Sequence, residues 1–222
     1  MAKILLTGFE AYGHTPHNPA ESVARMLDGK LVHGSKVIAR IVPNVFFECI
    51  EFVRASIAEV EPDIIVMMGE YGGRANITVE RIAQNLNDST RYDLVDNHGC
   101  ALQDQPTIPG GPVAYNSSLP IRAMVKAMRE SGIPSDISDT PGTFCCNHLM
   151  YGVLHHISSS GLPIRAGWIH LPHLPRVAAL PENLGAPSMS VETSVAGVEV
   201  GILAVLENPQ DIGEPIPSRL QI

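Results

Sequence analysis

Short runs of consecutive apolar residues alternate along this chain with segments whose apolar residues recur at helical spacing. An unbroken apolar run is typical of a strand that is covered on both faces of its sheet. The sequence predicts strands over residues 3–7, 36–42, 63–68, 135–140 and 164–170, and a mixed, extended segment over 77–83.

Helices are predicted between these strands. Asn18 followed by Pro19 and Glu21 predicts an N-cap, a first helical turn and a helix that stops near Gly29. Further helices are predicted over residues 50–60, 121–131, 146–160 and 191–206. This alternation predicts a single α/β domain with a twisted, mostly parallel sheet and helices on both faces. Ligands of such sheets bind at the carboxyl ends of the strands.

Composition limits the classes of function. The net charge of −8 argues against a nucleic-acid or membrane partner, because either needs a basic face. The four Cys are too few for a disulfide scaffold and the first residues do not resemble a signal peptide, so we expect a cytoplasmic protein with free thiols. We expect one catalytic domain over residues 1–207 and a Pro-rich, loosely ordered tail over 208–222.

The segment from Thr140 to His148 combines a strand end, a Gly turn and two Cys at the start of a helix. A helix N-terminus favours a thiolate, and its free N–H groups stabilise an oxyanion. Cys145 or Cys146 is therefore a candidate nucleophile, although most free Cys are small core residues. Cys49 and Cys100 are interpreted as structural or incidental.

A cysteine nucleophile needs a base and a group that orients it. His170 ends an apolar strand, where a general base would be expected, with a buried structural His as the alternative. His173 is a weaker candidate, and His148 is expected to point away from Cys146. Glu80 is a candidate orienting acid, but spacing alone favours an ion pair with Arg81 or another surface Arg.

Two other kinds of site are disfavoured by the spacing. Cys146, His148, His170 and His173 lack the usual zinc-ligand spacings, so no metal site is expected. The turn over residues 69–74 matches neither dinucleotide-binding nor phosphate-binding glycine patterns.

Four segments together resemble the pyrrolidone-carboxyl peptidases, the pyroglutamyl peptidase I family of cysteine peptidases. The resemblance covers the chain from about Lys3 to about Leu206. It is carried by Leu5-Leu-Thr-Gly-Phe-Glu-Ala-Tyr-Gly13 with Asn18-Pro19, Gly69-x-x-Gly72 to Asn85, Ile137 to Asn147-His-Leu, and Gly167-Trp-Ile-His170-Leu-Pro172.

The resemblance implies a role for each candidate. Cys146 would be the nucleophile, His170 the base and Glu80 its orienting partner. The implied reaction removes an N-terminal pyroglutamyl residue from a peptide and needs no metal or organic cofactor. The implied fold is a three-layer α/β/α sandwich, and the implied assembly is a homotetramer.

Further residues are implied to contact the substrate. Arg91 matches an arginine near the tetrahedral centre, Phe9 and Tyr12 would clasp the pyroglutamyl ring, and Asn18 would order their loop. A neutral lactam calls for apolar walls, a donor and an acceptor, and no carboxylate that would bind an ammonium group.

The sequence departs from the family at three positions. Tyr12 replaces an expected Phe, Cys145 an aliphatic residue, and Glu70 a residue that is Gln in some relatives. Three alternatives stay open: another cysteine amidohydrolase of the same fold, a nucleoside- or phosphate-binding enzyme, and a non-catalytic binding module.

Overall fold

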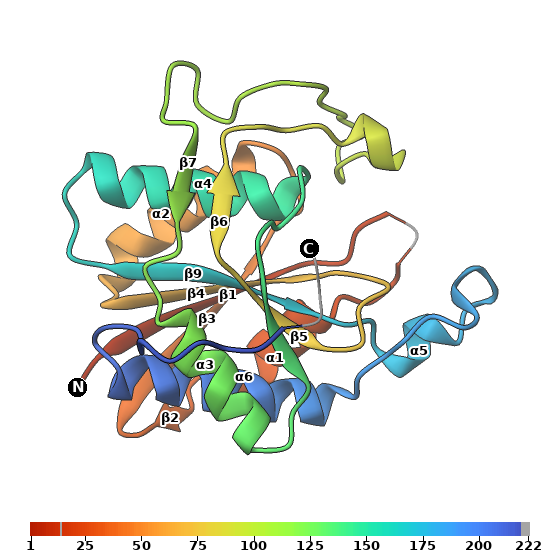
Figure 1. Ribbon diagram of the computed structural model, residues 1–222. Helices are drawn as coiled ribbons and strands as arrows, with labels where there is room; N and C mark the ends of the chain where they lie inside the picture. The colour runs from red at the N-terminus through yellow and green to blue at the C-terminus, as the bar shows by residue number, and fades with distance from the viewer. Residues whose placement is uncertain (14, 219–222) are drawn as a thin grey trace.

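A computed structural model describes residues 1–13 and 15–218 and shows a central sheet between two layers of helices (Figure 1). The sheet of this described part has seven strands. Their order is β2 (Leu31–Val32), β3 (Ser35–Val42), β1 (Lys3–Phe9), β4 (Ile64–Glu70), β9 (Arg165–Leu171), β5 (Ile77–Glu80) and β8 (Ser135–Ser138). The predicted three-layer α/β/α sandwich is confirmed.

The helices divide between the two faces of the sheet (Figure 1). One face carries α2 (Glu48–Val60) and α4 (Cys145–Ser159). The opposite face carries α1 (Pro19–Leu27), α3 (Ile121–Glu130) and α6 (Val191–Glu207). Because β1 and β4 have helices on both sides, Leu5 and Met67 pack toward α2 and α4, while Leu6 packs in the opposite core.

The start of α1 follows the local signals in the sequence. The side chain of Asn18 accepts a hydrogen bond of 2.9 Å from the backbone N–H of Ala20, and Pro19 occupies the first turn. The amide of Asn18 also donates to the carbonyl of Glu10 at 3.0 Å. Asn18 thus caps the helix and fixes the loop before it.

The sheet is mostly parallel, but its strands do not all run the same way. The strands β3, β1, β4 and β9 are parallel, whereas β5 pairs antiparallel with β9 and parallel with β8. In this register Thr78 lies opposite His170, and Glu80 lies opposite Trp168. The carboxyl end of β5 therefore points away from the edge where β9 ends.

Several short elements were not predicted. The strands β6 (Ile82–Gln84) and β7 (Ala114–Asn116) form a separate two-stranded antiparallel sheet, within what the sequence presents as an extended segment and a long loop. The helix α5 (Pro175–Ala178) and the 3₁₀ turns η1 (Thr90–Tyr92) and η2 (Pro181–Asn183) were also missed. These elements are too short to carry a periodic apolar signal.

The segment after α6 lies along α3. The carboxylate of Asp211 accepts hydrogen bonds from the backbone N–H groups of Arg122 and Ala123 at 3.0 to 3.1 Å. Further along, Arg129 donates to the carbonyl of Pro217 at 2.7 Å. Residues 208–218 are thus tied to the domain at several points. Residues 219–222 lie outside the described part of the chain. The loosely ordered tail over 208–222 stays a prediction.

None of the helices in residues 1–13 and 15–218 is long and apolar enough to cross a membrane.

Candidate active site

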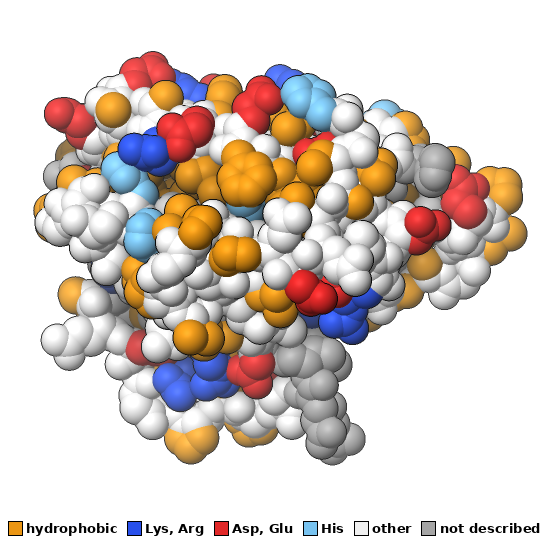
Figure 2. All heavy atoms as spheres, turned by 90° about the horizontal axis from the view of Figure 1, so that it is seen from above, with side chains coloured by type: hydrophobic (Ala, Val, Ile, Leu, Met, Phe, Trp, Pro, Cys, Tyr) orange, Lys and Arg blue, Asp and Glu red, His pale blue; other side chains and the backbone are white. Residues whose placement is uncertain are grey.

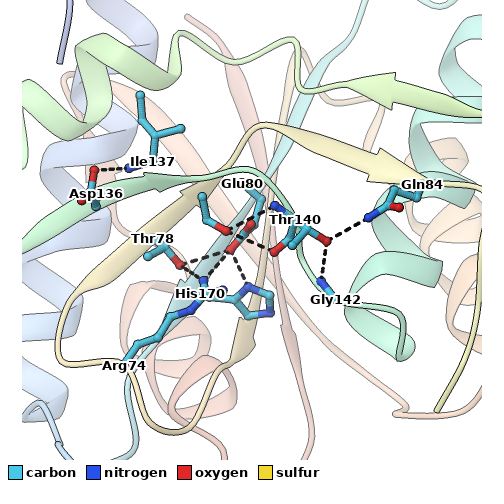
Figure 3. A network of polar contacts seen from close by, with 10 residues as sticks. Arg74, Thr78, Glu80, Gln84, Asp136, Ile137, Thr140, Gly142 and His170 are labelled. Carbon is cyan, nitrogen blue, oxygen red and sulfur yellow. Dashed lines mark hydrogen bonds and ion pairs between the residues drawn. The ribbon is translucent and has the colours of Figure 1, made fainter. Parts of the chain in front are cut away.

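His170 and Glu80 form the centre of a buried polar cluster (Figure 3). The Nδ1 atom of His170 lies 2.8 Å from Oε1 of Glu80, and both side chains are almost fully buried. A carboxylate only accepts hydrogen bonds, so Nδ1 carries the proton. The Nε2 atom is buried and unpartnered within the described chain, which leaves it available as a base.

Two more side chains converge on Glu80 (Figure 3). Arg74 Nη1 donates to Oε1 of Glu80 at 3.0 Å, and the hydroxyl of Thr78 donates to the same oxygen at 3.1 Å. The guanidinium of Arg74 also lies over the ring of Tyr71, 3.6 Å from its centroid. Arg81, the partner that spacing favoured, pairs instead with Asp139. Thr78 could have been found, because it shares a strand face with Glu80.

Cys146 is the cysteine at the cavity, whereas Cys145, the first residue of α4, is fully buried in the core on the side of the sheet that carries α2 and α4. A Cβ added to Gly69 would lie 2.8 Å from the Sγ atom of Cys146 and 3.5 Å from Cδ2 of His170. The thiol and the imidazole therefore approach the same point on β4. Position in the sequence left the two cysteines equivalent, and the fold distinguishes them.

The first turn of α4 is held by side chains that sequence reasoning missed. Asn147 accepts from the N–H of Gln84 at 2.8 Å and donates to the carbonyls of Gln84 and Leu86 at 2.9 Å. The hydroxyl of Thr140 accepts from the Gln84 amide and from the N–H of Gly142 (Figure 3). Polar residues beside the candidate cysteine were the only signal for this network.

The pKa shifts at the site oppose the thiolate that a helix N-terminus favours. Burial raises the pKa of the Cys146 thiol, and the negative charges of Glu80 and Glu70 raise it further. Burial lowers the pKa of His170, although the hydrogen bond with Glu80 opposes this shift. Both shifts favour a neutral thiol beside a neutral imidazole.

A cavity of about 200 Å³ opens onto Cys146 and His170. Its walls are largely aromatic and aliphatic, and include Tyr12, Tyr71, Leu94 and Phe144. Cavities for drug-sized ligands measure roughly 300–1,000 Å³, so this cavity suits a small acyl group.

The predicted substrate residues take different places. Tyr12 lines the cavity and packs against Phe144, with ring centroids 5.9 Å apart. Phe9 lies in the core against Trp168 and is not among the cavity-lining residues. Asn18 caps α1 and is not among the cavity-lining residues. Arg91 is exposed, with its guanidinium 5.0 Å from the centroid of the Tyr92 ring, and the structure does not bring it to the cavity wall.

The other histidines near the site have separate partners. The Nε2 atom of buried His148 accepts from the N–H of Phe47 at 2.9 Å. His173 lies 2.8 Å from Glu70 through its Nδ1 atom. The described residues contain no group of three or more His, Cys, Asp or Glu placed to hold a metal ion.

A cysteine, a histidine and a carboxylate beside a small cavity, at the end of a mostly parallel sheet, form the arrangement of a cysteine-type hydrolase. The family model described as pyroglutamyl peptidase matches residues 2–208. The chain belongs to the pyroglutamyl peptidase family.

Individual relatives agree with this assignment over the full length. A pyrrolidone-carboxylate peptidase of Mycobacterium tuberculosis is 61% identical over 222 residues, which is 100% of both chains. The crystal structure of pyroglutamyl peptidase I from Bacillus amyloliquefaciens matches with a TM-score of 0.91 and 34% identity, over 96% of this chain and 99% of that one. A mutant pyrrolidone carboxyl peptidase from Pyrococcus furiosus matches with a TM-score of 0.88 and 39% identity, over 92% and 98%.

Proposed function

We propose that this enzyme hydrolyses the bond after an N-terminal pyroglutamyl residue, with Cys146 as nucleophile, His170 as base and Glu80 as its orienting partner. The observation that carries the proposal is the approach of Cys146 and His170 to one point beside Gly69, in a small, largely apolar cavity. The names of the relatives, pyrrolidone-carboxylate peptidases, support the same reaction.

The proton transfers start from a neutral thiol and a neutral imidazole, the forms that the pKa shifts favour. Sγ of Cys146 attacks the pyroglutamyl carbonyl carbon while its proton passes to Nε2 of His170. The resulting imidazolium is stabilised by Glu80 and then protonates the leaving amine, which departs as the peptide and leaves a thioester. Water next attacks the thioester carbonyl and gives a proton to His170, and the thiol is restored when the acid leaves.

The start of α4 supplies the groups that stabilise the oxyanion. Phe144 occupies the N-cap position, and in the described structure its side chain makes no capping hydrogen bond. The first N–H groups of the helix therefore remain available beside Cys146. A contribution of Arg91 to oxyanion stabilisation stays a prediction. Its side chain would have to move from its place over Tyr92 to reach the cavity.

The substrate proposal is tested by release of aminomethylcoumarin from its pyroglutamyl derivative. Wild-type protein should release the fluorophore, Cys146→Ser should not, and Cys145→Ala should remain active because its side chain lies in the core. Activity that depends on phosphate would favour the nucleoside- or phosphate-binding alternative. No release by folded, reduced wild type would reject the pyroglutamyl substrate, and labelling of Cys146 by iodoacetamide would then favour another cysteine amidohydrolase.

The cytoplasmic location and the homotetramer are proposals from the sequence. The face that carries α2 and α4 shows apolar side chains gathered at its centre (Figure 2). Phe47 at the N-cap of α2 and Phe52 within α2 are among the exposed large apolar residues. Such exposure supports a contact between copies of the chain. Sedimentation at a mass of about four chains would support the tetramer, and a monomer alone would reject it.

A further inference from the structure

The cavity is bordered by a buried carboxylate other than that of Glu80, which is not among the lining residues. Glu70 ends β4, its side chain is fully buried, and it lines the same cavity as Cys146. Its Oε1 atom lies 2.8 Å from Nδ1 of His173, and its Oε2 atom is buried with no partner in the described chain. An unpaired carboxylate is costly to bury, so the charge of Glu70 depends on His173 for compensation.

The fold holds His173 in position for this contact. A Cβ at Gly72 would clash with Nε2 of His173, so the imidazole ring rests directly against the backbone at Gly72. The backbone carbonyl of His173 accepts a hydrogen bond of 2.9 Å from Met189. The hydrogen bond to Glu70 raises the pKa of His173, although partial burial opposes this shift. The pair is therefore biased toward an imidazolium facing a carboxylate.

Charges near the cavity thus form two pairs of opposite sign. Arg74 faces Glu80 at 3.0 Å, and His173 faces Glu70 at 2.8 Å. The charge of Glu70 is felt inside the cavity, because it adds to the effect of burial in raising the pKa of both Tyr12 and Cys146. Without an imidazolium at His173, one negative charge would remain uncompensated beside the thiol.

We propose that His173 is a specificity-determining residue, which compensates Glu70 and so makes the cavity selective for an uncharged N-terminal ring over a protonated amine. The inference rests on the proposed function and names the feature that selects its substrate. The sequence predicts a site without a carboxylate, and the structure has Glu70 in the cavity wall, so selectivity for a neutral lactam requires compensation. An uncompensated carboxylate would instead attract an ammonium group in this poorly solvated space.

The test compares two small ligands as competitive inhibitors of pyroglutamyl-aminomethylcoumarin hydrolysis at about pH 6, where a histidine of raised pKa is protonated. Pyroglutamic acid amide has a neutral ring, and prolinamide has the same five-membered ring with a protonated nitrogen. The measured quantity is the ratio of the inhibition constant of prolinamide to that of pyroglutamic acid amide. In His173→Asn, which keeps a donor near Nδ1 but removes its charge, this ratio should fall roughly tenfold.

A double variant separates charge from shape. His173→Asn combined with Glu70→Gln removes both charges, so the ratio should return to the wild-type value. A ratio that His173→Asn leaves unchanged would overturn the proposal. The same holds for a fall that persists in the double variant, because that fall would come from altered shape.

A second readout does not depend on the identity of the substrate. In a Cys100→Ser background, which removes an exposed thiol, iodoacetamide should alkylate Cys146 more slowly in His173→Asn and faster in Glu70→Gln than in the parent. Rates that neither substitution changes would contradict the charge pair. If the wild type releases no fluorophore, the proposed function fails, while the alkylation rates still decide whether this pair acts on Cys146.

Discussion

Glu80 and His170 lie on adjacent antiparallel strands, two positions out of direct register, and are joined by a hydrogen bond of 2.8 Å. Side chains in this diagonal relation share one face of the sheet and are within reach of each other when they are long. The residue directly opposite His170 is Thr78, whose hydroxyl donates to Glu80. The antiparallel pairing of β5 with β9 therefore brings Glu80 to His170, although the two strands run in opposite directions.

Removing the charge of Glu80 should impair catalysis more than folding. Glu80→Gln keeps an oxygen for the Nδ1–H of His170 but no longer stabilises the imidazolium, so kcat should fall roughly 10²- to 10⁴-fold. Arg81→Gln is the matched control, because its neighbouring side chain pairs with Asp139 at the surface. A folded Glu80→Gln protein with wild-type kcat would show that the charge of Glu80 does not stabilise the imidazolium.

The approach of α4 to β4 requires a glycine at position 69. A Cβ there would lie 2.8 Å from both Sγ of Cys146 and Cζ2 of Trp168, closer than real Cβ contacts. Gly69→Ala should displace the thiol and lower kcat by about 10²-fold, with roughly 1–3 kcal/mol lost in the free energy of unfolding. Gly213→Ala should change neither quantity, because its Cβ would meet no described atom within 4 Å. Equal kinetics of the two variants would refute this account of Gly69.

Acid should destabilise the protein through His148. Burial lowers its pKa to about 3, whereas an unfolded histidine titrates near ~6.5. Between these values the unfolded chain binds a proton that the folded chain does not. The free energy of unfolding therefore decreases as the pH is lowered, by up to about 1.4 kcal/mol per pH unit. Burial lowers the pKa of His170 as well, which acts in the same direction.

Urea unfolding of wild type and His148→Gln between about pH 7 and 4 measures the contribution of His148. The variant should be less stable at pH 7 and should lose less stability on acidification. Parallel pH profiles would assign the acid sensitivity to other groups.

The contact between Asp211 and α3 should stabilise the domain. Its carboxylate accepts from two N–H groups in the first turn of the helix, as a capping residue does. Asp211→Asn should therefore cost about 1 kcal/mol in the free energy of unfolding. Glu214→Gln changes an exposed ion pair with Lys126 and should have little effect. The midpoints of thermal unfolding of the two variants are compared. Equal midpoints would mean that the contact of Asp211 with α3 does not stabilise the domain.

Features that depend on neighbouring residues were predicted correctly from the sequence. The apolar runs of β1 and β4 indicated buried strands, and Asn18-Pro19 indicated the start of α1. His170 could be proposed as a base because it stands at the end of such a strand.

Features that depend on distant pairing were not predicted. The direction of β5 relative to β9 has no local signal, so Glu80 could be paired with His170 only by resemblance to a family. Arg74 and Thr78 reach Glu80 through the same turn and strand, and Glu70 meets His173 across 103 positions. Short β7 pairs with β6, which lies about thirty residues before it in the chain. These contacts are set by tertiary packing, which overrides weak local preferences.

The most direct test of the account is the identity of the acylated residue. Wild-type enzyme is mixed with a pyroglutamyl ester, quenched in acid within the first turnover, digested and mapped by mass spectrometry. With Cys146 as nucleophile, one pyroglutamyl group is expected on Cys146 and none on Cys145. An adduct on another residue, or rapid turnover by the Cys146→Ala variant, would contradict it.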